Sequence, residues 1–241
     1  MFTSKGENNN FKTGLLDGVP IALGYAAVSF AFGLYAVGEG LSVLEAILIS
    51  VFNLTSAGQM AAVPIIAGGG GLIELAVTQL VINMRYSLMS VSLSQRFGGS
   101  VRLSDRFLVA FANTDEIFAT AIGKGVPLGR RYLFALAIAP FLGWTLGTAL
   151  GAVLGDILPD IIVSSLGISL YAMFIAIFVP RAKESLPVAL AVISAIALSC
   201  AFYYIPALSE VPGGFVIMIC AVPVSAIFAL VAPIRDGEGE Q

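Results

Sequence analysis

The sequence contains no histidine, and only two cysteines occur among its 241 residues. Without histidine the chain can build neither an imidazole-based catalytic dyad nor the HExxH zinc motif. Cys200 and Cys220 both lie inside apolar runs, where we expect them to pack as small side chains rather than form a disulfide. Metal sites draw on clustered Cys, His and acidic ligands, and the sequence offers little of this kind. These absences predict no metal, no cofactor and no enzyme.

Charge is scarce as well. Charged residues make up 11% of the chain and hydrophobic residues 58%, whereas a soluble domain usually carries about 25% charged residues. So few polar side chains could not cover the surface of a water-soluble protein of this size. The net charge of −3 also argues against a nucleic-acid partner. The composition therefore predicts an all-α, polytopic integral membrane protein embedded in a lipid bilayer.

Apolar runs recur along the whole chain, each close to the roughly 20 residues that a helix needs to cross a bilayer. The first is longer than the roughly 7–15 residues of a signal-peptide core, so we interpret it as a retained helix. An eighth apolar run, 107–121, is shorter and contains Asp115 and Glu116. We expect one transmembrane transporter domain over 13–234, with cytoplasmic tails at 1–12 and 235–241. The seven clear runs are 15–37, 42–67, 72–93, 132–155, 161–179, 186–205 and 213–232.

Lysine and arginine gather in short connections, which the positive-inside rule places in the cytoplasm. All of these connections fall inside only if 42–67 and 107–121 are broken or re-entrant segments that return to the side where they began. In the rival arrangement all eight runs cross, and only the loop from Arg96 to Arg106 violates the rule. The residues leave both arrangements open, and both place the N- and C-termini in the cytoplasm. The basic residues are Lys5, Lys12, Arg96, Arg102, Arg106, Lys124, Arg130, Arg131, Arg181, Lys183 and Arg235.

Glycine and proline interrupt the same two runs. Pro64 and four consecutive glycines, 68–71, end the first, and the sequence GKG at 123–125 ends the second. Short or glycine-interrupted segments in both parts of a membrane chain point to a transport site built from broken helices. We therefore expect the functional residues near 51–71 and 107–125.

A polar stripe lies inside the first interrupted run, in the sequence VFNLTSAGQM at 51–60. On a helix, Thr55 and Gln59 are separated by four residues and Asn53 and Ser56 by three, so these side chains share one face. Gly58 among them allows a backbone or a ligand to come close. The structural alternative is that these groups hold neighbouring helices together, at about 0.6 kcal/mol each. We interpret the stripe as part of a substrate path.

Charged residues occur inside two further apolar runs. Asn83 and Arg85 lie in VINMRYSLMS, and an arginine in hydrocarbon costs at least about 2.5 kcal/mol unless it faces a cavity or a partner. Asp115 and Glu116 lie in NTDEIFAT, where adjacent side chains point about 100° apart on a helix, so only one can face a given cavity squarely. These acids suit a proton-coupled step or an ammonium ligand. The alternative is an architectural salt bridge from one of them to Arg85.

Two patterns have ordinary structural explanations. Glycines at 143, 147, 151 and 155 recur every four residues, which predicts a tight contact between two helices. Six acids lie near the ends of predicted spans, where an interfacial position explains them. They are Asp17, Glu39, Glu45, Glu74, Asp156 and Asp160.

Three motifs in order carry a resemblance to a known family. The stretch from Gly18 that ends in NLTSAGQMAAV, then VINMRYSLMS, then NTDEIFA resembles the AzlC family of bacterial inner-membrane proteins. The resemblance covers about 14–232 and is strongest over 18–120. Two positions depart from the family pattern. NLTSAGQMAA stands where the family reads closer to AGAAQFAA, and Tyr86 follows the arginine where histidine is common.

The resemblance implies a subunit of a secondary transporter that exports branched-chain or other small apolar amino acids across the inner membrane. It also implies a small AzlD-like membrane partner. Proton coupling through Asp115 or Glu116 is our expectation, while a passive pore for small zwitterions and a non-transporting structural subunit remain alternatives. The residues expected at the substrate site are Asn53, Ser56, Gly58, Gln59, Asn83, Arg85, Asp115 and Glu116, with Phe52, Met60, Phe111 and Phe118 as apolar walls.

Overall fold

The computed structural model describes residues 8–155, 161, 175, 179–180 and 182–232. The regular elements of this part of the chain are helices, so the all-α prediction is confirmed. Two isolated β-bridges pair Leu128 with Asn8 and with Phe97. Four of the helices are long and apolar enough to span a membrane. The predicted run 161–179 lies almost entirely outside the described residues, as does the tail 235–241, and the total of seven or eight runs stays a prediction. The four helices are α1 (Phe11–Gly38), α7 (Arg130–Leu154), α9 (Leu186–Tyr204) and α10 (Gly213–Val231).

Both interrupted runs are broken into two short helices. The first contains α2 (Val43–Phe52) and α3 (Ser56–Ala67), separated by three residues of which Asn53 is extended. The second lies after α4 (Leu72–Ser94) and contains α5 (Leu103–Phe111) and α6 (Asp115–Ile122). We call the separating residues, 53–55 and 112–114, the first and second break. The structure thus confirms the prediction of broken segments at both places.

The chain divides into two compact units. The first consists of Met1–Val63 and Ile82–Leu170, and the second of Pro64–Val81 and Tyr171–Gln241. In the second unit, α9 and α10 pack against each other. The residues expected at the substrate site all belong to the first unit, which is therefore the part of the fold that positions the site.

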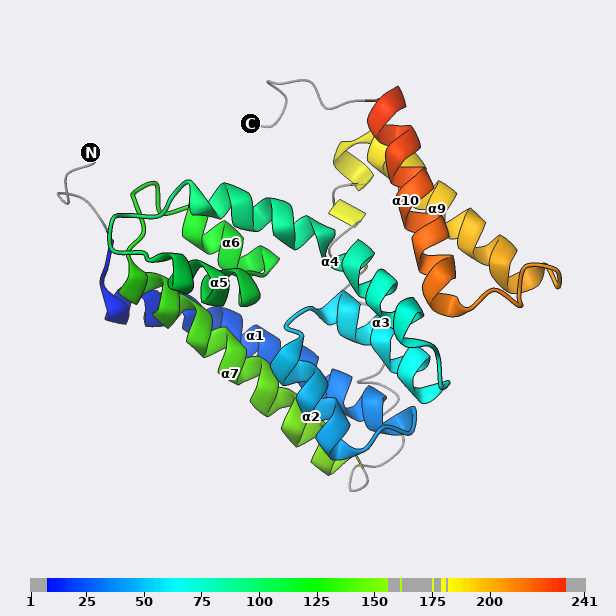
Figure 1. The fold of residues 1–241 in the computed structure, drawn as a ribbon, viewed down its shortest axis with the longest axis horizontal. Coiled ribbons are helices and arrows are strands. Elements are labelled where there is room, and N and C mark those ends of the chain that lie inside the picture. The colour runs from blue at the N-terminus through cyan, green and yellow to red at the C-terminus, as the bar shows by residue number, and fades with distance from the viewer. Residues whose placement is uncertain (1–7, 156–160, 162–174, 176–178, 181, 233–241) are drawn as a thin grey trace. The chain divides into compact units, whose positions relative to one another are not determined.

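The first unit is organised around two parallel helices, α1 and α7 (Figure 1). Gly14 and Gly18 of α1 approach the α7 backbone at Tyr132 and Leu136, and Gly33 approaches it near Thr148, so the two helices run in the same direction. A methyl group at Gly143, Gly147 or Gly151 of α7 would overlap the α1 backbone. This close contact is the one that the four-residue glycine spacing predicts.

One end of the first unit collects its basic residues, and we call it the basic end. The backbone N–H of Asn8 donates to Pro127 (2.9 Å) and that of Leu128 to Arg96 (2.8 Å), so the N-terminal segment, the loop after α4 and the loop after α6 meet there. Lys124 forms an ion pair with Asp17 at 2.6 Å. The described basic residues of this unit other than Arg85 lie in these segments or in the first turn of a helix that adjoins them, namely Lys12, Arg96, Arg102, Arg106, Lys124, Arg130 and Arg131.

The two broken segments enter the first unit from opposite ends. Ala46 of α2 and Val63 of α3 both pack with Ala36 and Ala152, at the end of α1 and α7 away from the basic end. The second segment begins and ends at the basic end, because its residues pack with Leu128 and Tyr132 there (Figure 1). Each segment therefore returns to the end where it began, which is the geometry of the re-entrant arrangement. The packed residues of the second segment are Val109, Ile117 and Ala121.

The two breaks meet near the middle of the α1–α7 pair. Leu54 of the first break and Ala112 of the second break share one buried cluster with Ala137 and Trp144 of α7. Tyr25 of α1 packs against the same cluster. Each broken segment forms a pair of short helices that enters from one end of the unit. The two breaks therefore lie at the same level along α1 and α7.

Candidate functional site

A buried glutamine side chain supplies hydrogen bonds at the first break. Gln59 is fully buried, and its Nε2 donates to the backbone carbonyl of Asn53 and to the hydroxyl of Ser50 (3.3 Å). Its Oε1 accepts a hydrogen bond of 3.1 Å from the indole N–H of Trp144. Because Asn53 is the C-cap residue of α2, its carbonyl lies outside the hydrogen-bond ladder of that helix, and the Gln59 amide supplies a donor. Gln59 therefore supplies hydrogen bonds that connect the first break to Ser50 and Trp144.

The second break is held by a hydroxyl and a tyrosine. Thr114 caps α6, and its hydroxyl also shares a hydrogen bond of 2.6 Å with the hydroxyl of Tyr25. The same tyrosine hydroxyl donates to Glu116, and its ring meets the Trp144 ring edge-on, with 5.1 Å between centroids. Tyr25 and Trp144, which belong to the two parallel helices, thereby connect the supports of both breaks.

The two adjacent acids of α6 take different partners. Asp115 forms an ion pair with Arg85 of α4 at 2.9 Å, while Glu116 accepts from Tyr25 of α1. Arg85 also donates to the hydroxyl of Tyr86 at 2.9 Å. The divergence follows from the 100° step between neighbouring helical residues. It realises the architectural salt bridge that the sequence left as an alternative, and Asp115 is the acid that forms it.

A cavity of about 160 Å³ lies between the two breaks. It is smaller than the roughly 300 Å³ at which pockets for drug-sized ligands begin, so it suits a small molecule. The residues around it come from both breaks, the adjoining ends of α2 and α5, and the middle of α4. They are Phe52, Asn53, Leu54, Thr55, Asn83, Tyr86, Ala110, Phe111 and Asn113.

Helix ends of both polarities converge on this cavity. The C-terminal ends of α2 and α5 carry partial negative charge, and the N-terminal ends of α3 and α6 carry partial positive charge. The α6 end already holds Asp115 and Glu116 in its first turn, whereas the first turn of α3 contains no acid. The positive end of α3 is therefore the one not neutralised by a nearby carboxylate.

The structure places the predicted site residues in three groups. Asn53, Asn83, Phe52 and Phe111 line the cavity, and Arg85 and Asp115 pair beside it through Tyr86. Ser56 and Gly58 lie in the first turn of α3, and Gln59 and Glu116 support the breaks. Met60 and Phe118 do not line the cavity, since Met60 packs against the cluster around Val63 and Phe118 against the cluster around Ile117.

Sequence reasoning missed Asn113 as a site residue. Its Nδ2 donates to Ser90 at 3.1 Å, while its buried Oδ1 has no hydrogen-bond partner within the described residues. A buried acceptor without a donor costs about 1–3 kcal/mol, so this oxygen is suited to receive a donor from a ligand. The signal in the sequence is the Asn–Thr pair before Asp115, which combines residues that favour helix caps.

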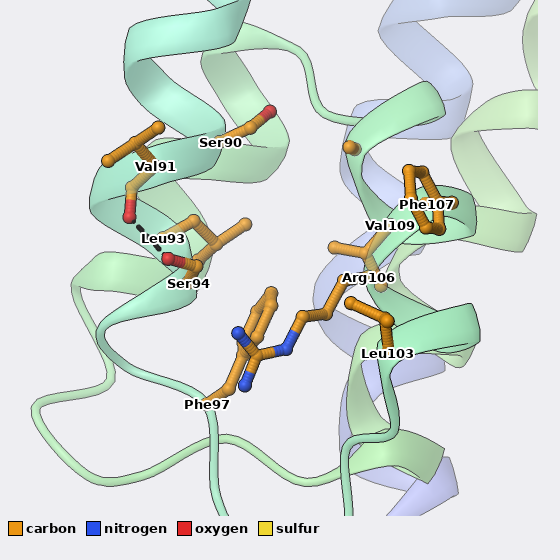
Figure 2. A pocket seen from close by; sticks show the side chains of 10 residues that line it. Ser90, Val91, Leu93, Ser94, Phe97, Leu103, Arg106, Phe107 and Val109 are labelled. Atoms are coloured by element: carbon orange, nitrogen blue, oxygen red, sulfur yellow. Dashed lines mark hydrogen bonds between the residues drawn. The ribbon is translucent and has the colours of Figure 1, made fainter.

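A second cavity of about 250 Å³ lies closer to the basic end, between α4 and α5 (Figure 2). Its lining is mainly aliphatic and aromatic, with Leu93, Phe97, Leu103 and Phe107 among the residues. The guanidinium of Arg106 lies over the Phe97 ring, 5.5 Å from its centroid. Its lining contains no residue of either break, so this cavity lacks the helix ends of both polarities that meet at the first cavity.

Comparison with known proteins agrees with the resemblance seen in the motifs. The family described as "AzlC protein" matches residues 20–158, which is more than half of the chain. The chain belongs to the AzlC family. The matched AzlC region contains both breaks, the cavity between them and the Arg85–Asp115 pair.

Among its relatives, this AzlC protein is 33% identical over 138 residues to the inner membrane protein YgaZ of Escherichia coli, covering 56% of each chain. It is 29% identical over 134 residues to an uncharacterized membrane protein of Archaeoglobus fulgidus, covering 56% of this chain and 58% of that one. The chain thus spans somewhat more than half the length of these relatives. No solved structure gives a significant match.

Proposed function

We propose that this AzlC protein is the transporting subunit of an exporter for small, mostly apolar amino acids. The observation that carries the proposal is the cavity at the meeting point of two helix breaks, each on a hairpin that enters from a different end of the unit. Transporters commonly place substrate sites near the bilayer midplane, between discontinuous helices whose ends face the ligand. No bond needs to be made or broken for this function.

The ends of the cavity suit a zwitterion. The substrate carboxylate binds at the N-terminal end of α3, where Ser56 and Gly58 lie in the first turn and no acid competes. The substrate ammonium binds near the second break, where Asn113 offers its buried Oδ1 and Asp115 supplies negative charge beside the cavity. Asn53 and Asn83 provide hydrogen bonds in between.

The walls of the cavity select an apolar side chain. Phe52, Leu54 and Phe111 line it together with Ala110, and its volume of about 160 Å³ leaves room for a short side chain only. Burial of apolar surface stabilises binding by about 25 cal/mol per Å². A branched-chain side chain such as that of leucine, isoleucine or valine meets both conditions, in line with the family resemblance.

The Arg85–Asp115 pair acts as a movable link beside the cavity. Both side chains are close to half exposed, 49% and 44%, and an ion pair that exposed contributes little to stability. An arginine inside an apolar helix is nevertheless costly without a partner. We infer that the ammonium group of the substrate competes with Arg85 for Asp115 during the transport cycle.

The proposed setting is the bacterial inner membrane, with the basic end in the cytoplasm. Lysine and arginine are enriched in cytoplasmic connections. The described basic residues of the first unit gather at its basic end, which supports this orientation. The proposed partner is a small AzlD-like membrane protein, and the driving force is the proton gradient.

Amino-acid efflux tests the proposal. Cells preloaded with radiolabelled leucine, valine, methionine or glutamate are compared with and without the protein, alone and with an AzlD-like partner. We expect faster efflux of the apolar amino acids and no change for glutamate. Arg85→Gln and Asp115→Asn are expected to abolish efflux while the protein still inserts into the membrane. Normal efflux by both variants would contradict the assignment of the site.

Collapse of the proton gradient separates export from a passive pore. A coupled exporter stops moving leucine against its concentration gradient when the proton gradient is removed, whereas a pore never moves leucine uphill. Unchanged efflux of every amino acid in the panel, with and without the partner, would instead favour a structural subunit.

A further inference from the structure

The second unit contains a buried carboxylate that the substrate cavity does not use. Glu74, in the first turn of α4, is only 8% exposed. Its Oε1 accepts a hydrogen bond of 2.9 Å from the backbone N–H of Gly214, at the start of α10. The sequence favours an ordinary interfacial acid at this position, but an interfacial acid would reach water. Burial under α10 gives Glu74 a different environment.

A second buried polar group faces the same point. Thr78, one helical turn after Glu74, is fully buried, and its Oγ1 has no hydrogen-bond partner within the described residues. A Cβ placed on Gly214 would lie 2.5 Å from Thr78 Oγ1 and 2.9 Å from Glu74 Oε1. The hydroxyl and the carboxylate therefore converge on the backbone of α10, where only glycine fits.

The described surroundings of Glu74 supply no cation. Within the described residues no ion pair involves Glu74. The glycine turn 68–71 before it and helix α10 carry no charged side chain. Glu210, on the loop that leads into α10, is exposed, and Lys183 and Glu184 lie just before α9, which packs on α10. A buried carboxylate without a cation is costly, and taking up a proton removes its charge.

We propose that Glu74 is the group that binds and releases the coupling proton, an inference that rests on the proposed export function. The proton comes from water and adds to Oε2, while Oε1 keeps its hydrogen bond from Gly214. The Thr78 hydroxyl, which has no partner within the described residues, is able to donate to a carboxylate and to accept from a carboxylic acid. It is therefore suited to bond with Glu74 in either state once its side chain turns toward the carboxyl group.

The two acids of α6 are less suited to this role. Asp115 is paired with Arg85, and Glu116 accepts from Tyr25, so a proton on either would disturb a contact beside the substrate cavity. Glu74 lies on the same continuous helix as Asn83 and Arg85, which border that cavity or pair beside it. Proton binding at the start of α4 can therefore bias the position of residues that the substrate touches.

Two transport measurements on the full chain in liposomes test the proposal. The first is exchange of radiolabelled leucine at equal pH on both sides. The second is leucine accumulation in vesicles whose lumen is one pH unit more acidic, where one-for-one antiport supports about tenfold accumulation, since a pH unit is a tenfold ratio in proton activity. Glu74→Gln is expected to keep exchange and lose accumulation. Glu39→Gln, an exposed acid at the end of α1, is the matched control and keeps both.

Thr78→Val provides an independent variant. It removes the hydroxyl but keeps the shape of the side chain, and we expect a shift in the pH midpoint of accumulation with exchange intact. Wild-type accumulation by Glu74→Gln would overturn the proposal. Loss of both exchange and accumulation in that variant would also overturn it, because Glu74 would then support the fold or the substrate path. Absence of leucine exchange in the wild type would contradict the export function instead.

Discussion

At the residue scale, the roles of neighbouring side chains depend on the direction in which each one points. Asp115 and Glu116 are adjacent, yet one pairs with Arg85 of α4 and the other accepts from Tyr25 of α1. The 100° helical step predicts that they diverge but does not say toward what. Asn113 was not assigned to the site from the sequence, yet it lines the cavity, and its buried Oδ1 has no hydrogen-bond partner among the residues that the structure describes.

The unpaired oxygen of Asn113 leads to the first prediction. Asn113→Ala should weaken leucine binding by roughly tenfold to a hundredfold, because a hydrogen bond to a charged group contributes about 1.5–3 kcal/mol. Isothermal titration of the purified protein with leucine measures the change. Ser90→Ala is the control, since it removes the partner of Nδ2 and leaves Oδ1 in place. Equal affinity in Asn113→Ala and the wild type would remove Asn113 from the site.

At the element scale, the two breaks share a local pattern. Phe52 directly precedes the first break and Thr55 is the last residue of it, and Phe111 and Thr114 take the same positions at the second break. In each case the threonine comes directly before the next helix, where its hydroxyl can accept from the backbone. The pattern in the sequence therefore carries more information on the breaks than Pro64, which lies inside α3, or the four glycines, which follow α3.

The support behind the first break gives the second prediction. Gln59→Leu removes the hydrogen bond from Gln59 to the carbonyl of Asn53 and the one that Gln59 accepts from the indole N–H of Trp144. Each buried group that loses its hydrogen bond costs about 1–3 kcal/mol, so we expect a clear fall in the melting temperature in detergent. Gln95→Leu, exposed after α4, is the matched control and should leave it nearly unchanged. Equal melting temperatures would contradict a supporting role for Gln59.

The contact between α1 and α7 gives the third prediction, which compares a glycine-to-alanine substitution inside the contact with the same substitution outside it. Gly151→Ala should prevent correct folding, because its methyl group would overlap the backbone of Phe30. Gly24→Ala, on α1, meets nothing within 4 Å and should stabilise the helix by up to about 1 kcal/mol. Gel filtration and thermal melting of both variants measure the difference. A well-folded Gly151→Ala protein would show that the helices are less closely packed than described.

At the scale of the whole molecule, two features of the first unit favour the same membrane arrangement. They are the end at which the basic residues gather and the ends from which the two broken segments enter. The loop after α4 lies at the same end as the N-terminal segment and the loop after α6. If all eight runs crossed the membrane, the loop after α4 would lie on the opposite side from these two. The described geometry therefore favours the re-entrant arrangement over the rival one.

Labelling of single cysteines provides the fourth prediction. In a background with Cys200 and Cys220 replaced, Glu39→Cys, Gln95→Cys and Val126→Cys each place one thiol in a connection. We expect an impermeant maleimide added to intact cells to label Glu39→Cys only. Gln95→Cys decides between the arrangements, because it would be labelled from outside if every run crossed. Labelling of all three after membrane disruption is the control for thiol accessibility.

The sequence by itself determined the membrane class, the presence of two broken segments and the polar residues near them, because composition and the spacing of residues act locally along the chain. It did not place the breaks, since Pro64 lies inside α3 and the four glycines follow that helix. It also marked the glycine ridge of α7, which the contact with α1 confirms. Only the tertiary structure decided that the two breaks meet beside Trp144, that Gln59 bonds to Trp144, and that Asp115 rather than Glu116 forms the ion pair with Arg85. The physical reason is distance along the chain, since helical periodicity says which residues share a face but not what that face meets. Contacts between residues separated by 30 to 90 positions, such as Arg85–Asp115 and Tyr25–Thr114, are set by how whole helices pack.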